Sequence, residues 1–387
     1  MRLSPAAEAI PRSGIRAMAA LAQGKEGLLH LEYGEPGFFA PEAVRRAAAR
    51  AVMEERIVYT PTDGPLELKR EIAAKLLRVN RVAVDPEQVF VTHGGVGALY
   101  ASLGSVLGPG DRILMPDPGW PNVLGQVYTL GAEPVFYPLE AERGFQPEPE
   151  SWPVDERTRA VLINNPSNPT GAQFGRDMLE RIAAFARKHE LWVLSDEVYD
   201  QVYFGERPIS MLEVYPEGTL ASFSFSKTYA MTGWRLGYAV LQPGMRDWTT
   251  KVVESCYSSS SMVAQRAALA ALTEVGEAEI QRMVDSYRAT RDRALAILAQ
   301  AGRQRYVPEG AFYLMLPVPR GVSSESFARL LLERKGLVVV PGSTFGKRAD
   351  AEVRISLAAG EETVADGVSR ILELTQEFEY GASHLGI

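Results

Sequence analysis

Short apolar runs alternate with helical patterns along the middle of the chain. The apolar runs end in polar or turn residues, which is typical of buried strands, and the segments between them have the spacing of amphipathic helices. The predicted strands are VFVTH, RILMP, PVFYP, AVLINN, LWVLSD and LASFSFS, and a long helix is predicted from about Arg176 to His189. Strands that alternate with helices form mostly parallel sheets with helices on both faces. We therefore predict an α/β fold here.

The segments on either side of this region have a different pattern. Helices are predicted at PEAVRRAAARAVMEE and at residues 66–79 before the strands, and at residues 277–301 after them. The strand-like runs AFYLMLP, GLVVVP and EVRISLA then surround the helical pattern SSESFARLLLERKG, which indicates a smaller α+β unit. We predict three parts, which are an N-terminal arm that also joins the small domain (1–40), a large domain (41–284) and a small C-terminal domain (285–387).

Composition and charge argue against several classes of function. Hydrophobic residues make up 46% and charged residues 23% of the 387 residues, as in a folded globular protein. The formal charge of -7 argues against nucleic-acid binding, which depends on clustered Lys and Arg. No segment has the roughly 20 apolar residues of a membrane helix, and the N-terminus lacks the apolar region of a signal peptide. With one cysteine, Cys256, these features favour a cytoplasmic protein, and four separated histidines predict no metal site.

Two loops that follow predicted strands have residues suited to ligand binding. Gly94 and Gly95 lead directly into a helix, a geometry that presents backbone N–H groups to an anion such as phosphate. An ordinary tight turn is the alternative explanation. Asn168 lies between Pro166 and Pro169, which would hold its amide rigidly in a site, although such a density of turn residues also makes a plain loop.

Two further loops carry charged residues at the ends of apolar strands. Asp196 ends the run LWVLSD, and a carboxylate at that depth needs a cationic or donor partner, unless it only caps a helix. Lys227 follows a run of Ser and Phe, so its ammonium is partly desolvated, its pKa falls and the neutral amine becomes able to attack an aldehyde. A surface lysine is the alternative. Ser224, Ser226 and Arg235 offer hydroxyls and a guanidinium suited to phosphate.

Together these segments resemble the class I and II aminotransferases of fold type I, and the resemblance extends along nearly the whole chain. The matching strings, in order, are YGEPGF, YTPTDG, GGVGAL, MPDPGWP, NNPSNPTG, SDEVYD, SFSKTYAMTGWRLGY and VRISLA. The resemblance implies an enzyme that uses pyridoxal 5'-phosphate (PLP) to move an amino group from an L-amino acid to a 2-oxo acid in a ping-pong cycle.

The resemblance also implies roles for individual residues. Lys227 is similar to the Schiff-base lysine, Asp196 to the partner of the pyridine nitrogen, and Tyr199 and Asn168 to the donors to the phenolic oxygen. Trp120 is similar to the aromatic residue that stacks on the cofactor ring and faces the substrate. The residues that resemble the phosphate site are Gly94, Gly95, Val96, Ser224, Ser226 and Arg235.

Substrate binding and assembly are implied in the same way. Arg354 resembles the fork that binds the substrate's α-carboxylate, with help from Gly34 and Asn168. Tyr59 resembles a residue that reaches the phosphate from a second subunit, which implies a homodimer. The alternative activity is that of a PLP-dependent lyase on the same fold, either a carbon–sulfur lyase or an aminocyclopropane-carboxylate synthase. The carbon–sulfur lyases tend to carry His where this chain has Tyr199, which disfavours them.

The chain departs from the family pattern after YGEP. The family often has Asp at this point, whereas here Gly37 is followed by Phe38 and Phe39. Two adjacent Phe would favour apolar or aromatic substrate side chains, or they would pack in the core. We favour the second interpretation, because adjacent Phe at the start of a helix are commonly buried.

Overall fold

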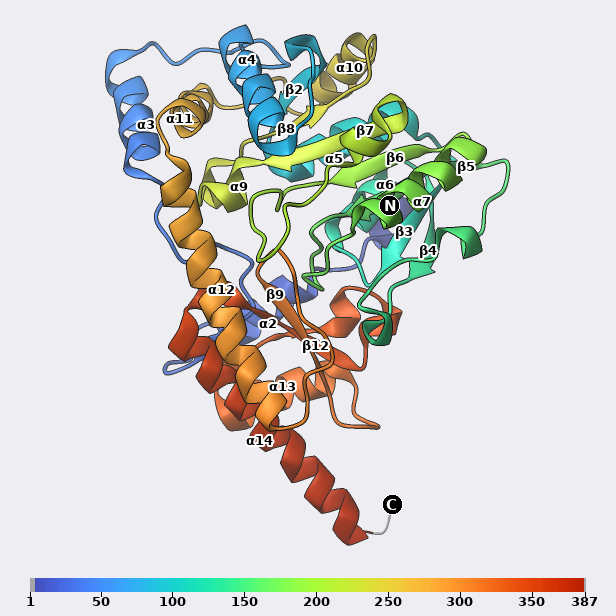
Figure 1. Cartoon of the computed structure of the whole chain (residues 1–387), viewed down its shortest axis with the longest axis vertical. Coiled ribbons are helices and arrows are strands. Elements are labelled where there is room, and N and C mark those ends of the chain that lie inside the picture. The colour runs from blue at the N-terminus through green and yellow to red at the C-terminus, as the bar shows by residue number, and fades with distance from the viewer. Residues whose placement is uncertain (1–3, 386–387) are drawn as a thin grey trace.

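The structure, a computed structural model, describes residues 4–385 and is built around a central sheet of seven strands (Figure 1). The strand order is β2-β8-β7-β6-β5-β3-β4, and only β8 runs antiparallel to its neighbours. The strands are β2 (Val89–Thr92), β3 (Arg112–Asp117), β4 (Glu133–Pro138), β5 (Thr158–Asn164), β6 (Trp192–Asp196), β7 (Thr219–Ser224) and β8 (Gly237–Val240). The predicted mostly parallel α/β sheet is confirmed, whereas β8 was not predicted.

Helices cover both faces of this sheet because its strands are apolar on both sides. In β5, Val161 and Ile163 pack with the cluster that contains α7, while Ala160 and Leu162 pack with the cluster of α5 and α6 on the other face. The helices of the large unit are α3 (Glu42–Glu54), α4 (Leu66–Lys75), α5 (Gly94–Val106), α6 (Asn122–Thr129), α7 (Arg176–Lys188), α8 (Met211–Val214), α9 (Phe225–Thr228), α10 (Arg246–Cys256) and α11 (Met262–Thr273).

A smaller α+β unit packs against the large one. Its three-stranded antiparallel sheet has the order β11-β12-β9, and the long helix α12 runs beside it from the region of the large sheet (Figure 1). Strand β1 of the N-terminal arm pairs with β10, so the arm joins this unit. The remaining elements are α1 (Pro5–Ala9), α2 (Gly14–Ala22), β1 (Leu29–His30), α12 (Glu277–Gln300), β9 (Tyr313–Pro317), α13 (Ser324–Lys335), β10 (Leu337–Val338), β11 (Val340–Pro341), β12 (Glu352–Ser356) and α14 (Glu361–Leu385).

The strand predicted to run to the lysine ends earlier than expected. Strand β7 stops at Ser224, and Lys227 lies in the one-turn helix α9. Ser224 causes this change, because its hydroxyl accepts a hydrogen bond from the backbone N–H of Ser226 at 3.1 Å and so caps the helix. The turn moves Lys227 off the strand direction and toward the space above the sheet.

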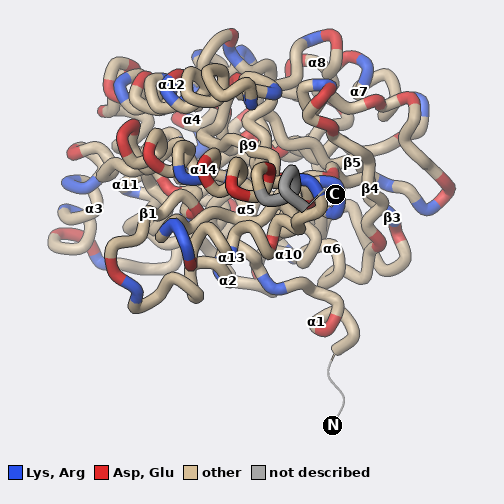
Figure 2. The backbone as a smooth tube through the Cα atoms, turned by 90° about the horizontal axis from the view of Figure 1, so that it is seen from below, with Lys and Arg blue, Asp and Glu red and all other residues tan. Residues whose placement is uncertain are grey.

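Charged residues of both signs are interspersed over the outer helices and loops (Figure 2). Among residues 4–385, no helix is long and apolar enough to cross a membrane.

One buried ionic cluster holds the loop after β6 against α4. The ammonium of Lys75 forms an ion pair with Asp200 and donates to Asn80 Oδ1 at 2.8 Å, while Asn80 Nδ2 donates to Asp200 at 3.1 Å. The side chains of Lys75 and Asp200 are almost fully buried. The cluster therefore anchors the loop that follows Asp196 to the end of α4, and this loop contributes to the site described below.

We predict that Lys75→Met lowers the free energy of unfolding by about 3–5 kcal/mol, because it leaves the Asp200 carboxylate buried without a cation. The matched control is Arg46→Ala, which breaks the exposed Arg46–Glu42 pair and is expected to cost less than about 1 kcal/mol. Urea unfolding of both variants measures the difference. Equal losses of unfolding free energy in the two variants would show that burial does not determine how much the Lys75–Asp200 pair stabilises the protein.

Candidate active site

A cavity of about 1030 Å³ lies where the carboxyl ends of the large sheet meet the small unit and the N-terminal arm. The large sheet contributes its loops after β5, β6 and β7, and the small unit contributes Tyr313 and Arg354. Open α/β sheets bind ligands at this edge. The residues predicted for the site that line the cavity are Gly34, Gly95, Val96, Trp120, Asn168, Asp196, Tyr199, Ser224, Ser226, Lys227, Arg235 and Arg354.

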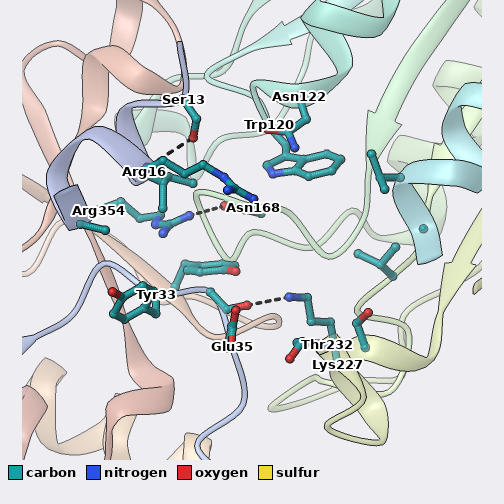
Figure 3. Close-up of a pocket in the computed structure, with 18 of the residues that line it drawn as sticks. Ser13, Arg16, Tyr33, Glu35, Trp120, Asn122, Asn168, Lys227, Thr232 and Arg354 are labelled. Atoms are coloured by element: carbon teal, nitrogen blue, oxygen red, sulfur yellow. Dashed lines mark hydrogen bonds between the residues drawn. The ribbon is translucent and has the colours of Figure 1, made fainter. Parts of the chain in front are cut away.

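Lys227 presents a dehydrated amine to this cavity. Burial lowers the pKa of the Lys227 ammonium to about 8, with Glu35 acting in the opposite direction. Its Nζ donates to the carbonyl oxygen of Gly34 at 2.6 Å, which aims the amine across the cavity toward the N-terminal arm (Figure 3). An amine with this pKa is partly neutral near pH 7, which is the state that attacks a carbonyl carbon.

Asp196 is a buried carboxylate that lacks a close cationic partner among the described residues. Burial raises the pKa of Asp196 to about 7, against the opposing effects of the Val198 N–H and of Lys227. The hydrogen bond from Val198 N is long, at 3.4 Å. A carboxylate in this state gains most from a cationic N–H donor placed beside it.

Tyr199 is held by a second tyrosine that sequence reasoning did not single out. Its hydroxyl lies 2.9 Å from the hydroxyl of Tyr313, and both side chains are buried. Burial raises the pKa of Tyr199 well above the usual value for tyrosine, so its hydroxyl stays protonated. Tyr313 belongs to the run AFYLMLP, whose apolar pattern indicated only a strand of the small unit.

Arg354 extends from β12 as a fully buried cation between two aromatic rings. Its guanidinium carbon lies 4.4 Å from the ring centre of Tyr313 and 4.8 Å from that of Phe345. Its Nη1 donates to Asn168 Oδ1 at 3.1 Å and its Nη2 donates to the Glu32 carbonyl oxygen at 2.6 Å. Its Nε has no hydrogen-bond partner among the described residues. This planar donor group is suited to a carboxylate.

The N-terminus of α5 forms an anion-binding surface at the other end of the cavity. Gly94 has a φ of +71°, and a Cβ there would lie 2.8 Å from Arg235 Nη2, so glycine permits the approach of the arginine. Gly237 on β8 is required for a similar reason, since its Cβ would lie 2.5 Å from the Gly94 carbonyl carbon. The helix N-terminus, the hydroxyls of Ser224 and Ser226 and the Arg235 cation together favour phosphate.

Two predicted site residues do not line this cavity. Gly94 is buried next to the guanidinium of Arg235, whereas Tyr59 is 90% exposed on the surface of the large unit. The expectation that Phe38 and Phe39 pack in the core is wrong, because they are 40% and 88% exposed. Phe38 packs edge-to-face with Tyr287, and Phe39 lies under the guanidinium of Arg45.

The residues present fit the cofactor that the sequence resemblance implies. Asp196 is a buried carboxylate suited to a protonated pyridine nitrogen, and Lys227 is a dehydrated amine suited to an aldehyde. Trp120 lies over the same cavity with its ring exposed to the space between Arg354 and Lys227 (Figure 3). The helix N-terminus supplies the donors that a phosphate group needs.

Comparisons with known proteins agree with this interpretation. The chain matches the family described as aminotransferase class I and II over residues 26–371. It is 35% identical to the aspartate/prephenate aminotransferase of Thermus thermophilus, over 89% of this chain and 90% of that protein. It is 34% identical to aromatic-amino-acid aminotransferase 2 of Thermococcus litoralis, over 97% and 99% of the two chains.

A solved structure gives the same result for the fold. The structure of aspartate aminotransferase from Thermus thermophilus with maleate superimposes with a TM-score of 0.90 at 35% identity, covering 96% of this chain and 99% of the other. With the family match, this similarity establishes the activity and the cofactor. The chain belongs to the class I and II aminotransferases and is a PLP-dependent aminotransferase of fold type I.

Proposed function

We propose that this aminotransferase works with Lys227 as the lysine that binds the cofactor and moves protons, Asp196 as the partner of the pyridine nitrogen, and Arg354 as the anchor of the substrate α-carboxylate. The observation that carries this assignment is that the dehydrated Lys227 amine, with its pKa lowered to about 8, faces the same cavity as the other two residues. Transfer runs from an L-amino acid to a 2-oxo acid, and no observation favours the lyase alternative.

The proposed division of work begins with the cofactor. When bound, PLP supplies an aldehyde that takes up the amino group and a ring that stabilises negative charge at the substrate Cα. Asp196 keeps the ring nitrogen protonated, because pairing with a cation relieves the cost of its own burial. Tyr199 and Asn168 would hold the cofactor through its phenolic oxygen, and Trp120 would pack against its ring. The phosphate is assigned to Gly94, Gly95, Val96, Ser224, Ser226 and Arg235.

The remaining residues place the substrate and move the proton. Arg354 binds the α-carboxylate through its planar donors, and Asn168, which accepts from Arg354 at 3.1 Å, holds that guanidinium in place. Gly34 contributes its carbonyl oxygen, which orients the Lys227 amine. The neutral amine of Lys227 would accept the proton from Cα, and its ammonium form would pass that proton to C4' of the cofactor, which suits a group with a pKa of about 8.

We further propose that the enzyme is a homodimer in which Tyr59 reaches the phosphate site of the partner subunit. Support comes from a group of exposed apolar side chains on the arm and on α3 and the loop after it, of which Phe39, Met53 and Tyr59 are each more than 80% exposed. Exposed apolar groups of this density mark interaction surfaces on proteins. Tyr59 is too exposed to serve the cavity of its own chain.

The domain division and location are also proposed. The division into 1–40, 41–284 and 285–387 is supported by the pairing of β1 with β10, which places the arm with the small unit. The second boundary falls within α12, the helix that runs beside both units. A cytoplasmic location is supported by the single cysteine, Cys256.

The assignment of Lys227 predicts the position of the covalent link to the cofactor. Borohydride treatment of the yellow enzyme followed by peptide mass spectrometry should find the pyridoxyl group on Lys227. The variant Lys227→Ala should bind the cofactor without a reducible link and lose at least about 1000-fold in turnover, because it lacks both the link and the acid–base group. Lys69→Ala, another buried lysine, is the control and should keep the link. A pyridoxyl group on another lysine would overturn the assignment.

The assignment of Asp196 predicts a pH-dependent stability in protein freed of cofactor. Its folded-state pKa, about 7, lies above the value of 3.8 expected for an unfolded chain. Between these values the folded protein holds a proton that the unfolded chain has released, so stability from this group is present at low pH and falls as pH rises. Asp196→Asn should therefore exceed wild type in unfolding free energy by roughly 2–4 kcal/mol above pH 7 and match it near pH 4.

Urea unfolding at pH 4, 6 and 8 measures this difference. Adding PLP at pH 8 should reverse the order, because only the carboxylate pairs with the ring nitrogen. A constant gap between the two proteins across the pH range would contradict the burial of an ionisable Asp196.

The proposed role of Tyr59 predicts complementation between two defective subunits. In a mixed dimer of Lys227→Ala and Tyr59→Phe chains, one site receives an intact Lys227 from one chain and an intact Tyr59 from the other. The affinity of that site for PLP should equal the wild-type value, whereas the Tyr59→Phe homodimer should bind PLP about 10-fold more weakly because one hydrogen bond to a charged group is lost. Weak binding at that site of the mixed dimer would place Tyr59 in its own chain's site, and wild-type affinity in the Tyr59→Phe homodimer would place it in neither.

A further inference from the structure

The hydroxyl of Tyr313 is buried beside the cavity and has a single hydrogen-bond partner. Tyr313 belongs to β9 of the small unit and lines the cavity, although it is only 1% exposed. Its hydroxyl lies 2.9 Å from the hydroxyl of Tyr199 and forms no other hydrogen bond within residues 4–385. Buried polar groups keep their hydrogen bonds because an unpaired one is costly. Whatever this hydroxyl does at the site is therefore done through Tyr199.

The direction of the hydrogen bond between the two tyrosines decides what Tyr199 can offer a ligand. Each hydroxyl has one proton to donate and lone pairs that accept. A Tyr199 that donated to Tyr313 would have no proton left for a group in the cavity. A Tyr313 that donates to Tyr199 leaves the Tyr199 proton free to be donated elsewhere. The role proposed for Tyr199 therefore requires Tyr313 to be the donor of the pair.

The charges around the pair favour Tyr313 as the donor. The guanidinium carbon of Arg354 lies 4.4 Å from the ring centre of Tyr313. Burial raises the pKa of the Tyr313 hydroxyl, and the Arg354 cation is the strongest influence against this rise. Burial also raises the pKa of Tyr199, where Arg354 acts less than Tyr313 does and the Asp196 carboxylate adds to the rise. Tyr313 thus holds the more acidic proton, and the more acidic hydroxyl is the better donor.

Packing keeps the hydroxyl of Tyr313 directed at Tyr199. The backbone of Tyr313 is fixed in the small sheet, where it pairs with Ser356 of β12. Its ring packs edge-to-face with the ring of Tyr199, at 5.9 Å between ring centres, and against Phe312 at 4.9 Å. Gly34 lies directly against the hydroxyl, because a Cβ at Gly34 would come within 2.3 Å of the Tyr313 oxygen. The hydroxyl therefore has little room to turn toward a different partner.

We propose that Tyr313 is a positioning residue, which donates its proton to the Tyr199 hydroxyl and so directs the Tyr199 proton at the phenolic oxygen of the cofactor. This inference rests on the proposed function, because it takes Tyr199 as a donor to that oxygen. Donation by Tyr313 also makes Tyr199 a stronger donor, since successive hydrogen bonds polarise one another. Asn168, the second residue assigned to the phenolic oxygen, is held separately by Arg354.

The test compares two ligands that differ only at the phenolic oxygen. Pyridoxamine 5'-phosphate and its 3-deoxy analogue, which lacks this oxygen, bind without a covalent link, and calorimetric titration of the full chain freed of cofactor gives both dissociation constants. For Tyr313→Phe, the affinity for pyridoxamine phosphate should fall about 5-fold, because one hydrogen bond between neutral groups is lost. The affinity for the 3-deoxy analogue should change less than about 2-fold, because Tyr199 has no acceptor on that ligand.

The matched control is Tyr287→Phe. Tyr287 is another buried tyrosine, and its ring packs against Phe312 at 5.2 Å between ring centres. Its hydroxyl has no hydrogen-bond partner in the described part of the chain. Tyr287→Phe should therefore change neither dissociation constant. Equal losses of affinity for the two ligands in Tyr313→Phe would show a general effect on packing and would overturn the inference.

Variants of Tyr199 separate this inference from the proposed function. Tyr199→Phe should weaken the binding of pyridoxamine phosphate about 10-fold relative to the 3-deoxy analogue. The double variant Tyr199→Phe/Tyr313→Phe should match Tyr199→Phe, because Tyr313 acts only through Tyr199. An unchanged ratio of the two affinities in Tyr199→Phe would refute the proposed role of Tyr199 itself. If that ratio changes as expected, then an unchanged or opposite ratio in Tyr313→Phe, or a further loss in the double variant, would overturn the role of Tyr313 alone.

Discussion

The structure depends on keeping the Lys227 amine and the Asp196 carboxylate dehydrated beside one cavity without a direct ion pair between them. Burial lowers the pKa of Lys227 to about 8 and raises that of Asp196 to about 7. Lys227 makes its hydrogen bond to the Gly34 carbonyl oxygen rather than to the carboxylate. The strand order places β6 next to β7, so Asp196 at the end of one strand and Lys227 just past the end of the next share an edge of the sheet. Each group is thereby left available for a ligand.

The small unit and the arm supply what the large sheet lacks. Arg354 belongs to the small unit and makes its hydrogen bonds across the boundary between the units. It donates to Asn168 of the large unit and to the Glu32 carbonyl oxygen of the arm. Tyr313 connects the two halves in a second way, since its ring stacks on Arg354 and its hydroxyl contacts that of Tyr199. Arg354 of the small unit and Tyr199 of the large unit are therefore joined through one tyrosine.

The part of the cavity formed by the large sheet was predicted largely from local signals, whereas Gly34, Trp120 and Arg354 were predicted only from the family resemblance. Asp196 and Lys227 were found from charges that follow apolar runs, and Gly94 and Gly95 from a turn before a helix. Tyr313 could not be found in this way, because nothing local distinguishes an aromatic residue in a strand from ordinary packing residues. The placement of Phe38 and Phe39 in the core was wrong because burial depends on what else covers a segment, and Phe39 stays 88% exposed beside the guanidinium of Arg45.

The N-terminal arm combines functions that the rest of the chain keeps apart. In sequence order it carries Arg16 at the cavity, the Gly34 carbonyl that orients Lys227, and the exposed ring of Phe39. It is held by β1 against β10 and by Gly14 against Thr344, both in the small unit. A partner that covers Phe39 would thus restrict the same segment whose Gly34 carbonyl oxygen orients the Lys227 amine. In the proposed homodimer, contacts at the exposed end of the arm would therefore act on the position of Lys227 through a single stretch of backbone.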